Sequence, residues 1–112
     1  MKNSTRFRND AFQRQGGSCY YCNFRMWTVG GDNFPPRYLR RLQCTAEHLV
    51  PLSQGGLTNA TNIVAACLYC NRTRHKAKRP LDFATFKARV QRRLSSGKWH
   101  PHSLFASDQI PR

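Results

Sequence analysis

The chain has 112 residues, of which 39% are hydrophobic, and its 19 Lys and Arg outnumber its 5 Asp and Glu, giving a formal net charge of +14. This length allows one domain with one modest core. No apolar run approaches the roughly 18 residues of a membrane-spanning helix, and the N-terminus lacks the apolar stretch of a signal peptide. We therefore expect a cytoplasmic protein with no membrane partner, whose charge suits a polyanion such as nucleic acid.

The first part of the chain predicts a short helix over residues 5–15, which Gly16-Gly17 ends. A tight knuckle is expected over residues 18–22. Residues 23–43 contain Gly-Gly and Pro-Pro pairs that interrupt regular structure, and a small hairpin is expected around residues 30–33.

The middle of the chain predicts two strands and a helix in close succession. A strand is expected over residues 42–50, then a Gly-rich loop over 51–60 and a short apolar strand over 63–66. A helix is expected over residues 68–78, and Pro80 ends it.

The last part of the chain predicts a helix over about residues 82–95, with Asp82 as its N-cap. Its apolar residues recur at helical spacing and indicate a core-facing stripe: Phe83, Phe86, Val90 and Leu94. We expect residues 1–96 to form a single domain, with a core over 6–79, and residues 97–112 to form a C-terminal tail.

Four cysteines form two Cys-x-x-Cys pairs: Cys19 with Cys22, and Cys67 with Cys70. Two such pairs complete a tetrahedral thiolate shell, so we expect a structural Zn²⁺ with no open coordination position. The alternative is a redox pair or free thiols. Zinc is favoured over this alternative because two matched pairs are more specific than one and the expected compartment is reducing. Cys44 is the odd cysteine, and we expect it to be a small buried hydrophobic residue.

A second pattern lies between and after these pairs. Glu47-His48 begins a run that reads EHLVPLSQGG, Asn62 lies beyond the Gly-Gly turn, and Asn71 follows the last cysteine. Together with the cysteine pairs, this pattern resembles the HNH family of nucleases over residues 6–79. The resemblance implies a small α+β fold, the ββα-metal finger, with a structural four-cysteine zinc knuckle pair and flanking N- and C-terminal helices.

The resemblance also implies roles for individual residues. His48 is the general base, a role that suits an imidazole near neutral pH, and a structural histidine is its alternative. Glu47 is a ligand of a catalytic metal, and Asn71 is its partner on the helix. Asn62 holds the loop of His48 by hydrogen bonds. His75 lies four residues after Asn71, on the same helical face, and is a candidate third ligand or else a phosphate contact.

This ligand set is rich in oxygen and suits Mg²⁺ or Mn²⁺, whereas ligation by His75 favours Ni²⁺, Co²⁺ or Zn²⁺. Adjacent strand residues point to opposite faces, so Glu47 and His48 must lie at a strand end or a bulge to share one site. Three residues depart from the family pattern: Glu47 replaces the more usual Asp, Asn71 replaces the third His, and Arg74 stands where Lys is frequent.

Basic side chains form three groups. Arg72, Arg74, Lys76, Lys78 and Arg79 lie on and after the predicted 68–78 helix; Arg37, Arg40 and Arg41 precede the first strand; and Arg89, Arg92 and Arg93 lie on the last helix. Such groups bind phosphates without reading sequence. Arg72 and Arg74 are expected to touch the cleaved strand because they directly follow Asn71. A solvated face is an equal alternative for the last group.

The sequence therefore predicts a divalent-metal-dependent endonuclease that cuts or nicks DNA, with a homodimer or a protein partner as a source of specificity. Two alternatives stay open. One is a non-catalytic zinc module that binds nucleic acid through its charge, and the other is the same chemistry on RNA, since phosphate contacts do not distinguish the two sugars.

Overall fold

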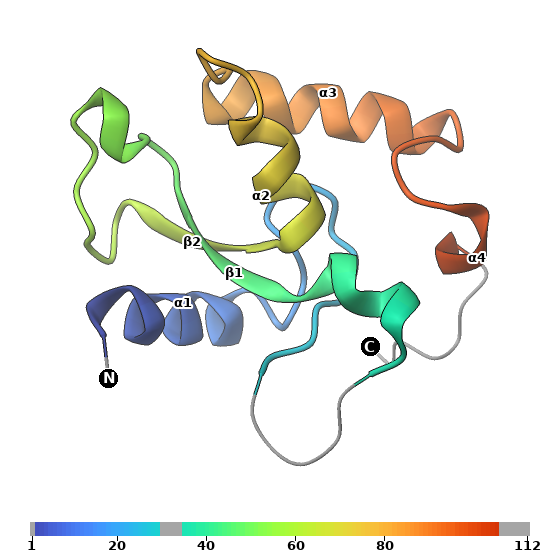
Figure 1. Ribbon diagram of the computed structural model, residues 1–112, viewed down its shortest axis with the longest axis horizontal. Coiled ribbons are helices and arrows are strands. Elements are labelled where there is room, and N and C mark those ends of the chain that lie inside the picture. Colours follow the sequence, from blue (N-terminus) through green and yellow to red (C-terminus); the bar gives the residue numbers. More distant parts are fainter. Residues whose placement is uncertain (1, 30–34, 106–112) are drawn as a thin grey trace.

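The computed structural model describes residues 2–29 and 35–105 and has a small α+β fold (Figure 1). Two antiparallel strands, β1 (Cys44–His48) and β2 (Ile63–Cys67), form a hairpin in which Cys44 pairs with Cys67 and His48 with Ile63. The helix α2 (Leu68–His75) follows β2 without a break. The hairpin and α2 form the ββα unit that the sequence predicts.

The hairpin lies between α1 (Asn3–Arg14) and α2 (Figure 1). Every residue of β2 is buried, which requires cover on both faces. The Gln15 side chain covers the outer edge of β2, because its amide group donates to Ala65 O (2.8 Å) and accepts from Ala65 N (2.9 Å). Gly16 and Gly17 then turn the chain with φ values of 62° and 80°, a conformation that glycine adopts without strain.

The predicted last helix is present as α3 (Phe83–Ser95). Its cap is the Asp82 carboxylate, which accepts from Thr85 N (3.1 Å) and Thr85 Oγ1 (2.8 Å). The hydrogen bond from the Thr85 side chain holds the pKa of this carboxyl below its usual value. Phe86 and Val90 face the core, as the apolar stripe predicts.

Several predicted boundaries differ from the structure. The first strand begins at Cys44, because residues before it form a 3-10 helix, η1 (Arg37–Leu42), that the sequence did not indicate. The helix α2 ends at His75 rather than near residue 78. The hairpin expected around residues 30–33 lies outside the described residues. Within residues 2–29 and 35–105, no helix has the length and apolarity to span a membrane.

The prediction that the chain ends in a tail is wrong for its first part, because residues 99–105 pack on the domain. Trp99 lies against Tyr69 and Phe86, with ring centroids 5.2 and 5.8 Å away. His100 and Leu104 are only 3% and 4% exposed, and Leu104 belongs to the short helix α4 (His102–Phe105). The burial of these apolar rings favours a folded segment over a solvated one.

The imidazole of His100 makes this segment sensitive to acid. Its Nδ1 accepts from Arg41 Nε (3.2 Å), and its Nε2 has no hydrogen-bond partner within the described part of the chain. Burial, together with the charge of Arg41, lowers the pKa of His100 from 6.5 to about 4.

We predict that the protein loses stability as the pH falls from 6.5 to 4. The unfolded chain takes up the proton first, so stability is complete above pH 6.5 and declines by up to about 3 kcal/mol across this window. His100→Gln keeps an acceptor for Arg41 but does not titrate, so its stability should change less with pH across the same range. Urea unfolding at stepped pH measures both slopes, and equal slopes would contradict the assignment.

Candidate nuclease site

The two cysteine pairs meet at one point between the knuckle and the start of α2. The thiols of Cys19, Cys22, Cys67 and Cys70 are buried, and their sulfur atoms all lie within 4.8 Å of one another. Cys19 Sγ accepts from the backbone N–H of Tyr21 (3.4 Å) and of Cys67 (3.2 Å), which orients the sulfur. These four donors fit a metal ion and are consistent with the predicted structural zinc.

The titration of this cluster supports the same conclusion. Burial raises the pKa of Cys19, but hydrogen bonds from the other three thiols outweigh it, so the pKa of Cys19 lies well below its usual value. Hydrogen bonding to Cys19 raises the pKa of Cys22, and burial raises that of Cys70. A thiol whose pKa is lowered among other sulfur donors is an arrangement that a divalent cation stabilises. Cys44 is buried apart from this cluster, as predicted for a small apolar side chain.

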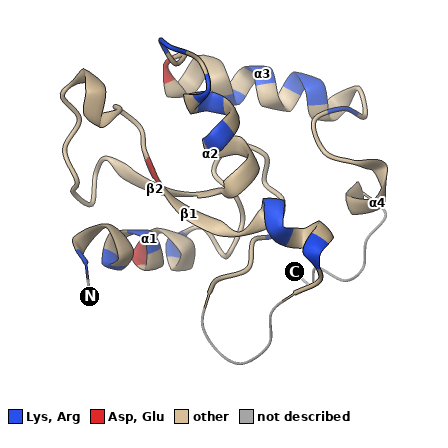
Figure 2. Ribbon diagram, in the orientation of Figure 1, with Lys and Arg blue, Asp and Glu red and all other residues tan. Residues whose placement is uncertain are grey.

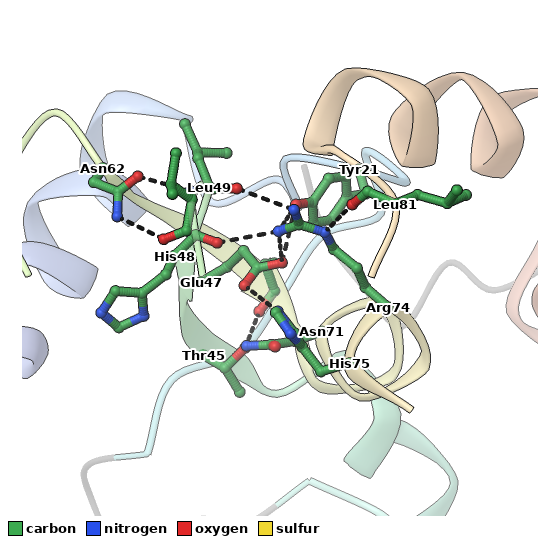
Figure 3. A network of polar contacts seen from close by, with 12 residues as sticks. Tyr21, Thr45, Glu47, His48, Leu49, Asn62, Asn71, Arg74, His75 and Leu81 are labelled. Carbon is green, nitrogen blue, oxygen red and sulfur yellow. Dashed lines mark hydrogen bonds and ion pairs between the residues drawn. The ribbon is translucent and has the colours of Figure 1, made fainter. Parts of the chain in front are cut away.

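The carboxylate of Glu47 is the centre of a polar network (Figure 3). The side chain is 1% exposed, and its Oε2 accepts from Arg74 Nη1 (3.1 Å) and from Tyr21 Oη (2.9 Å). Burial and the negative charge of Glu47 raise the pKa of Tyr21, so this hydroxyl stays protonated and can donate. Charge pairing and hydrogen bonding together offset the cost of burying a carboxylate.

The other oxygen of Glu47 faces His75. Its Oε1 lies 2.9 Å from His75 Nε2, and the His75 side chain is 32% exposed. Adjacent ligands on an octahedral cation at Mg²⁺-like distances lie about 3 Å apart. These two donor atoms therefore fit one cation. Asn71, one turn before His75, donates from its amide nitrogen to Thr45 Oγ1 (3.0 Å) and Ala46 O (3.2 Å). Asn71 lines one pocket together with Glu47 and His75.

His48 is the last residue of β1, so the strand end allows both Glu47 and His48 to reach one site. Figure 3 shows the two side chains leaving the strand in different directions. His48 Nε2 lies 3.0 Å from Thr58 Oγ1. Asn62 ties the two ends of the loop together: its Oδ1 accepts from Val50 N (2.8 Å), and its Nδ2 donates to Val50 O (3.0 Å). These are hydrogen bonds of the kind that the family resemblance implies for Asn62.

One pocket of about 300 Å³ brings these side chains together. Its walls come from the end of β1, from α2 and from the loop after β1, and include Glu47, His48, Asn71 and His75. The grouping that the sequence predicts is therefore present, with Asn62 behind it as a support of the loop.

The prediction that Arg74 contacts the nucleic-acid strand is wrong. Its side chain is 1% exposed. Its guanidinium donates to Leu81 O (3.0 Å), His48 O (3.1 Å) and Leu49 O (3.0 Å) as well as to Glu47. The position of Arg74 directly after Asn71 suggested a contact with the cleaved strand, but the i, i+4 relation to Cys70 places Arg74 on the buried face of α2.

The remaining basic residues of the predicted interface lie at the surface around α2 (Figure 2). The exposed members are Arg40, Arg72, Lys76, Lys78 and Arg79. Arg41 is half-buried, because its guanidinium stacks on the Tyr69 ring at 3.8 Å from the centroid.

Three residues of the network were not predicted from the sequence: Tyr21, Thr45 and Thr58. Tyr21 stands inside the first cysteine pair, where nothing in the local sequence marks it as the partner of a carboxylate. Thr45 precedes Glu47 by two residues on β1, so strand periodicity could have placed both on one face. No pattern in the sequence marks Thr58, which reaches His48 only through the path of the loop.

Residues 31–77 match the family model described as HNH endonuclease. The family resemblance seen in the sequence is thereby confirmed over this segment, and it implies a nuclease-type function with a nucleic-acid substrate. No curated protein matches the chain.

The Gly-Gly turn shapes the loop that carries Thr58. A Cβ added at Gly56 would lie 1.8 Å from Val50 O and 2.9 Å from Pro51 O, so the backbone would have to move. Gly55 has open space around it but a φ of 85°. The two glycines are therefore required for different reasons.

We predict that Gly56→Ala destabilises the protein more than Gly55→Ala. The clash at Gly56 should cost about 2–3 kcal/mol, as in overpacked sites, and the strain at Gly55 about 1 kcal/mol. Urea unfolding of both variants measures the difference. An equal or larger loss in Gly55→Ala would show that the loop does not depend on this close approach.

Proposed function

We propose that this protein is a divalent-metal-dependent endonuclease that hydrolyses phosphodiester bonds in DNA. The observation that carries the proposal is the convergence of Glu47, His48, Asn71 and His75 on one pocket, next to a cluster of four buried cysteines. A module that only binds nucleic acid has no need for a buried carboxylate that contacts His75 in a pocket that His48 also lines. The match to a family of endonucleases supports the same conclusion.

The catalytic cation would be held by Glu47 Oε1 and His75 Nε2, with the amide oxygen of Asn71 as a further donor. When bound, such an ion polarises the scissile phosphate and stabilises the charge on the leaving oxygen. Oxygen donors favour Mg²⁺ or Mn²⁺, and the imidazole favours Ni²⁺, Co²⁺ or Zn²⁺. Because Arg74 already neutralises part of the Glu47 charge, we expect this ion to exchange readily, unlike the ion held by the four thiols.

His48 would act as the general base. If Nε2 donates its proton to Thr58 Oγ1, then Nδ1 has a free lone pair for the proton of the attacking water. Water would then attack phosphorus as its proton passes to His48. The bond between phosphorus and the 3′-oxygen would break, and that oxygen would take a proton from solvent water. The products would be a 5′-phosphate and a 3′-hydroxyl. Thr58 is a positioning residue in this scheme, because it holds the ring and does not touch the substrate.

Sequence preference should be weak in the single domain, because its surface is small and its exposed cations contact phosphates rather than bases. A homodimer or a protein partner could supply specificity. We further propose a cytoplasmic site of action, where free thiols remain available for zinc.

We predict that His48→Ala lowers plasmid cleavage by at least about a hundredfold in every metal, because it removes the group that accepts the water proton. The assay compares wild type, His48→Ala and His102→Ala, an exposed histidine on α4, with Mg²⁺, Mn²⁺, Ni²⁺, Co²⁺ or Zn²⁺ added. His102→Ala should cleave as wild type does.

Full cleavage by His48→Ala would remove His48 as the base. Tight binding without cleavage by wild type in every metal would favour the alternative of a zinc-stabilised binding module. A parallel assay on a single-stranded RNA of the same sequence distinguishes DNA from RNA as the substrate.

A further inference from the structure

A second pocket lies between η1 and α2, on a face of α2 that neighbours the one with Asn71 and His75. Its volume is about 400 Å³, which falls within the range of about 300–1,000 Å³ for small-molecule sites. Its apolar and aromatic lining comes from Tyr38, Leu68 and Tyr69. The proposed catalysis makes no use of it.

Two residues that line this pocket, Arg41 and Tyr69, are held in place by contacts with each other and with residues 99–100. The guanidinium of Arg41 stacks on the Tyr69 ring at 3.8 Å from the centroid. Its Nε donates to His100 Nδ1 (3.2 Å) and its Nη2 to Trp99 O (3.0 Å). A planar cation stacked on an aromatic ring is therefore fixed before any ligand arrives. Tyr38, on the 3-10 helix η1, also lines the pocket and is 45% exposed, so its ring can contact a ligand.

The rim of the pocket is positively charged. Arg37, Arg40, Arg72 and Lys76 line it, and all four are exposed. Within residues 2–29 and 35–105, ion pairs form only at Glu47, so no described carboxylate neutralises these cations. Figure 2 shows that basic residues of η1 and α2 lie side by side around this position.

We propose that this pocket binds one unpaired base of a nucleic-acid strand, with the flanking phosphates on the cationic rim. Phosphates alone need only surface cations, whereas a hollow lined by tyrosines suits a flat apolar ligand. In an intact duplex the bases are stacked in the interior of the double helix and cannot enter the pocket. An extruded or single-stranded base can enter it.

This inference rests on the proposed function in taking nucleic acid as the ligand, and it specifies the form of the substrate. Tyr69 and Arg72 lie on one face of α2, with Lys76 directly after its end, and Asn71 and His75 lie on the next face. Both pockets border the same helix, which is about 10–12 Å across with its side chains, so they lie close together. A strand with a base in the second pocket can therefore continue across α2 into the Glu47 site, which predicts preferred cutting beside unpaired nucleotides.

The test measures binding, with no cleavage step, by fluorescence anisotropy of three labelled DNA duplexes in a His48→Ala background without added divalent metal. The first duplex is fully paired, the second carries one bulged nucleotide, and the third carries the same bulge without its base. We expect the bulged duplex to bind roughly tenfold more tightly than the other two, because the stacking of one base on an aromatic side chain raises affinity by about this factor.

Variants assign this preference to the pocket. Tyr38→Ala should reduce the preference for the bulged base to less than about threefold, and Tyr38→Phe, which keeps the ring, should retain it. The matched control is Phe105→Ala, which removes an aromatic side chain of similar exposure (42%) outside the pocket and should leave the preference unchanged.

Equal binding of the bulged and base-free duplexes, or an equal loss of preference in Tyr38→Ala and Phe105→Ala, would overturn the inference. Displacement of the bulged duplex by micromolar mononucleotide would indicate a free-nucleotide site instead, and would also overturn it. If the preference is present but wild type cuts no DNA in any metal, the pocket stands and the nuclease proposal falls, so the two failures are distinguishable.

Discussion

The buried carboxylate of Glu47 is the constraint on which the site depends. A carboxylate that is 1% exposed requires compensation, and Arg74 and Tyr21 supply it through one oxygen atom. Arg74 can do so only if α2 is held against β1, and Tyr21 only if the first cysteine pair is in place. Since Arg74 also binds the carbonyls of His48 and Leu49, the same ion pair fixes the start of the loop beyond β1. The second oxygen is left facing His75, where a cation can reach both.

The four-cysteine cluster makes this arrangement available to a chain of 112 residues. A small core alone provides little stability, and a metal that joins two distant segments adds what the core lacks. The cluster connects the knuckle that carries Tyr21 to the first turn of α2, the helix whose last turn carries Arg74 and His75. The two proposed ions thus have different requirements. Four enclosing thiolates would hold the structural ion, and a half-open set of oxygen and nitrogen donors would hold the catalytic ion.

The sequence predicted those parts of the structure that are governed by local spacing. The cysteine pairs, the Asp82 cap and the stripe of α3 each depend on residues a few positions apart, and all are present. The burial of Arg74 was not predicted, because a basic residue in a basic segment gives no sign of an inward-facing partner. Residues 99–105 were also missed, since their aromatic side chains have no helical or strand period and are buried only through contacts with distant segments. The contact between Thr58 and His48 depends on a loop path that no local pattern encodes.

The most direct test of this account is a calorimetric measurement of Mn²⁺ binding to three zinc-loaded proteins: wild type, His75→Ala and His102→Ala. We predict one Mn²⁺ site per chain in wild type and in His102→Ala, and an affinity at least about tenfold weaker in His75→Ala, which removes one donor but leaves the Glu47–Arg74 pair intact. An unchanged zinc content across the three proteins would show that the fold is preserved. Equal Mn²⁺ affinity in His75→Ala and His102→Ala would contradict the claim that the carboxylate of Glu47 and the imidazole of His75 hold the catalytic ion.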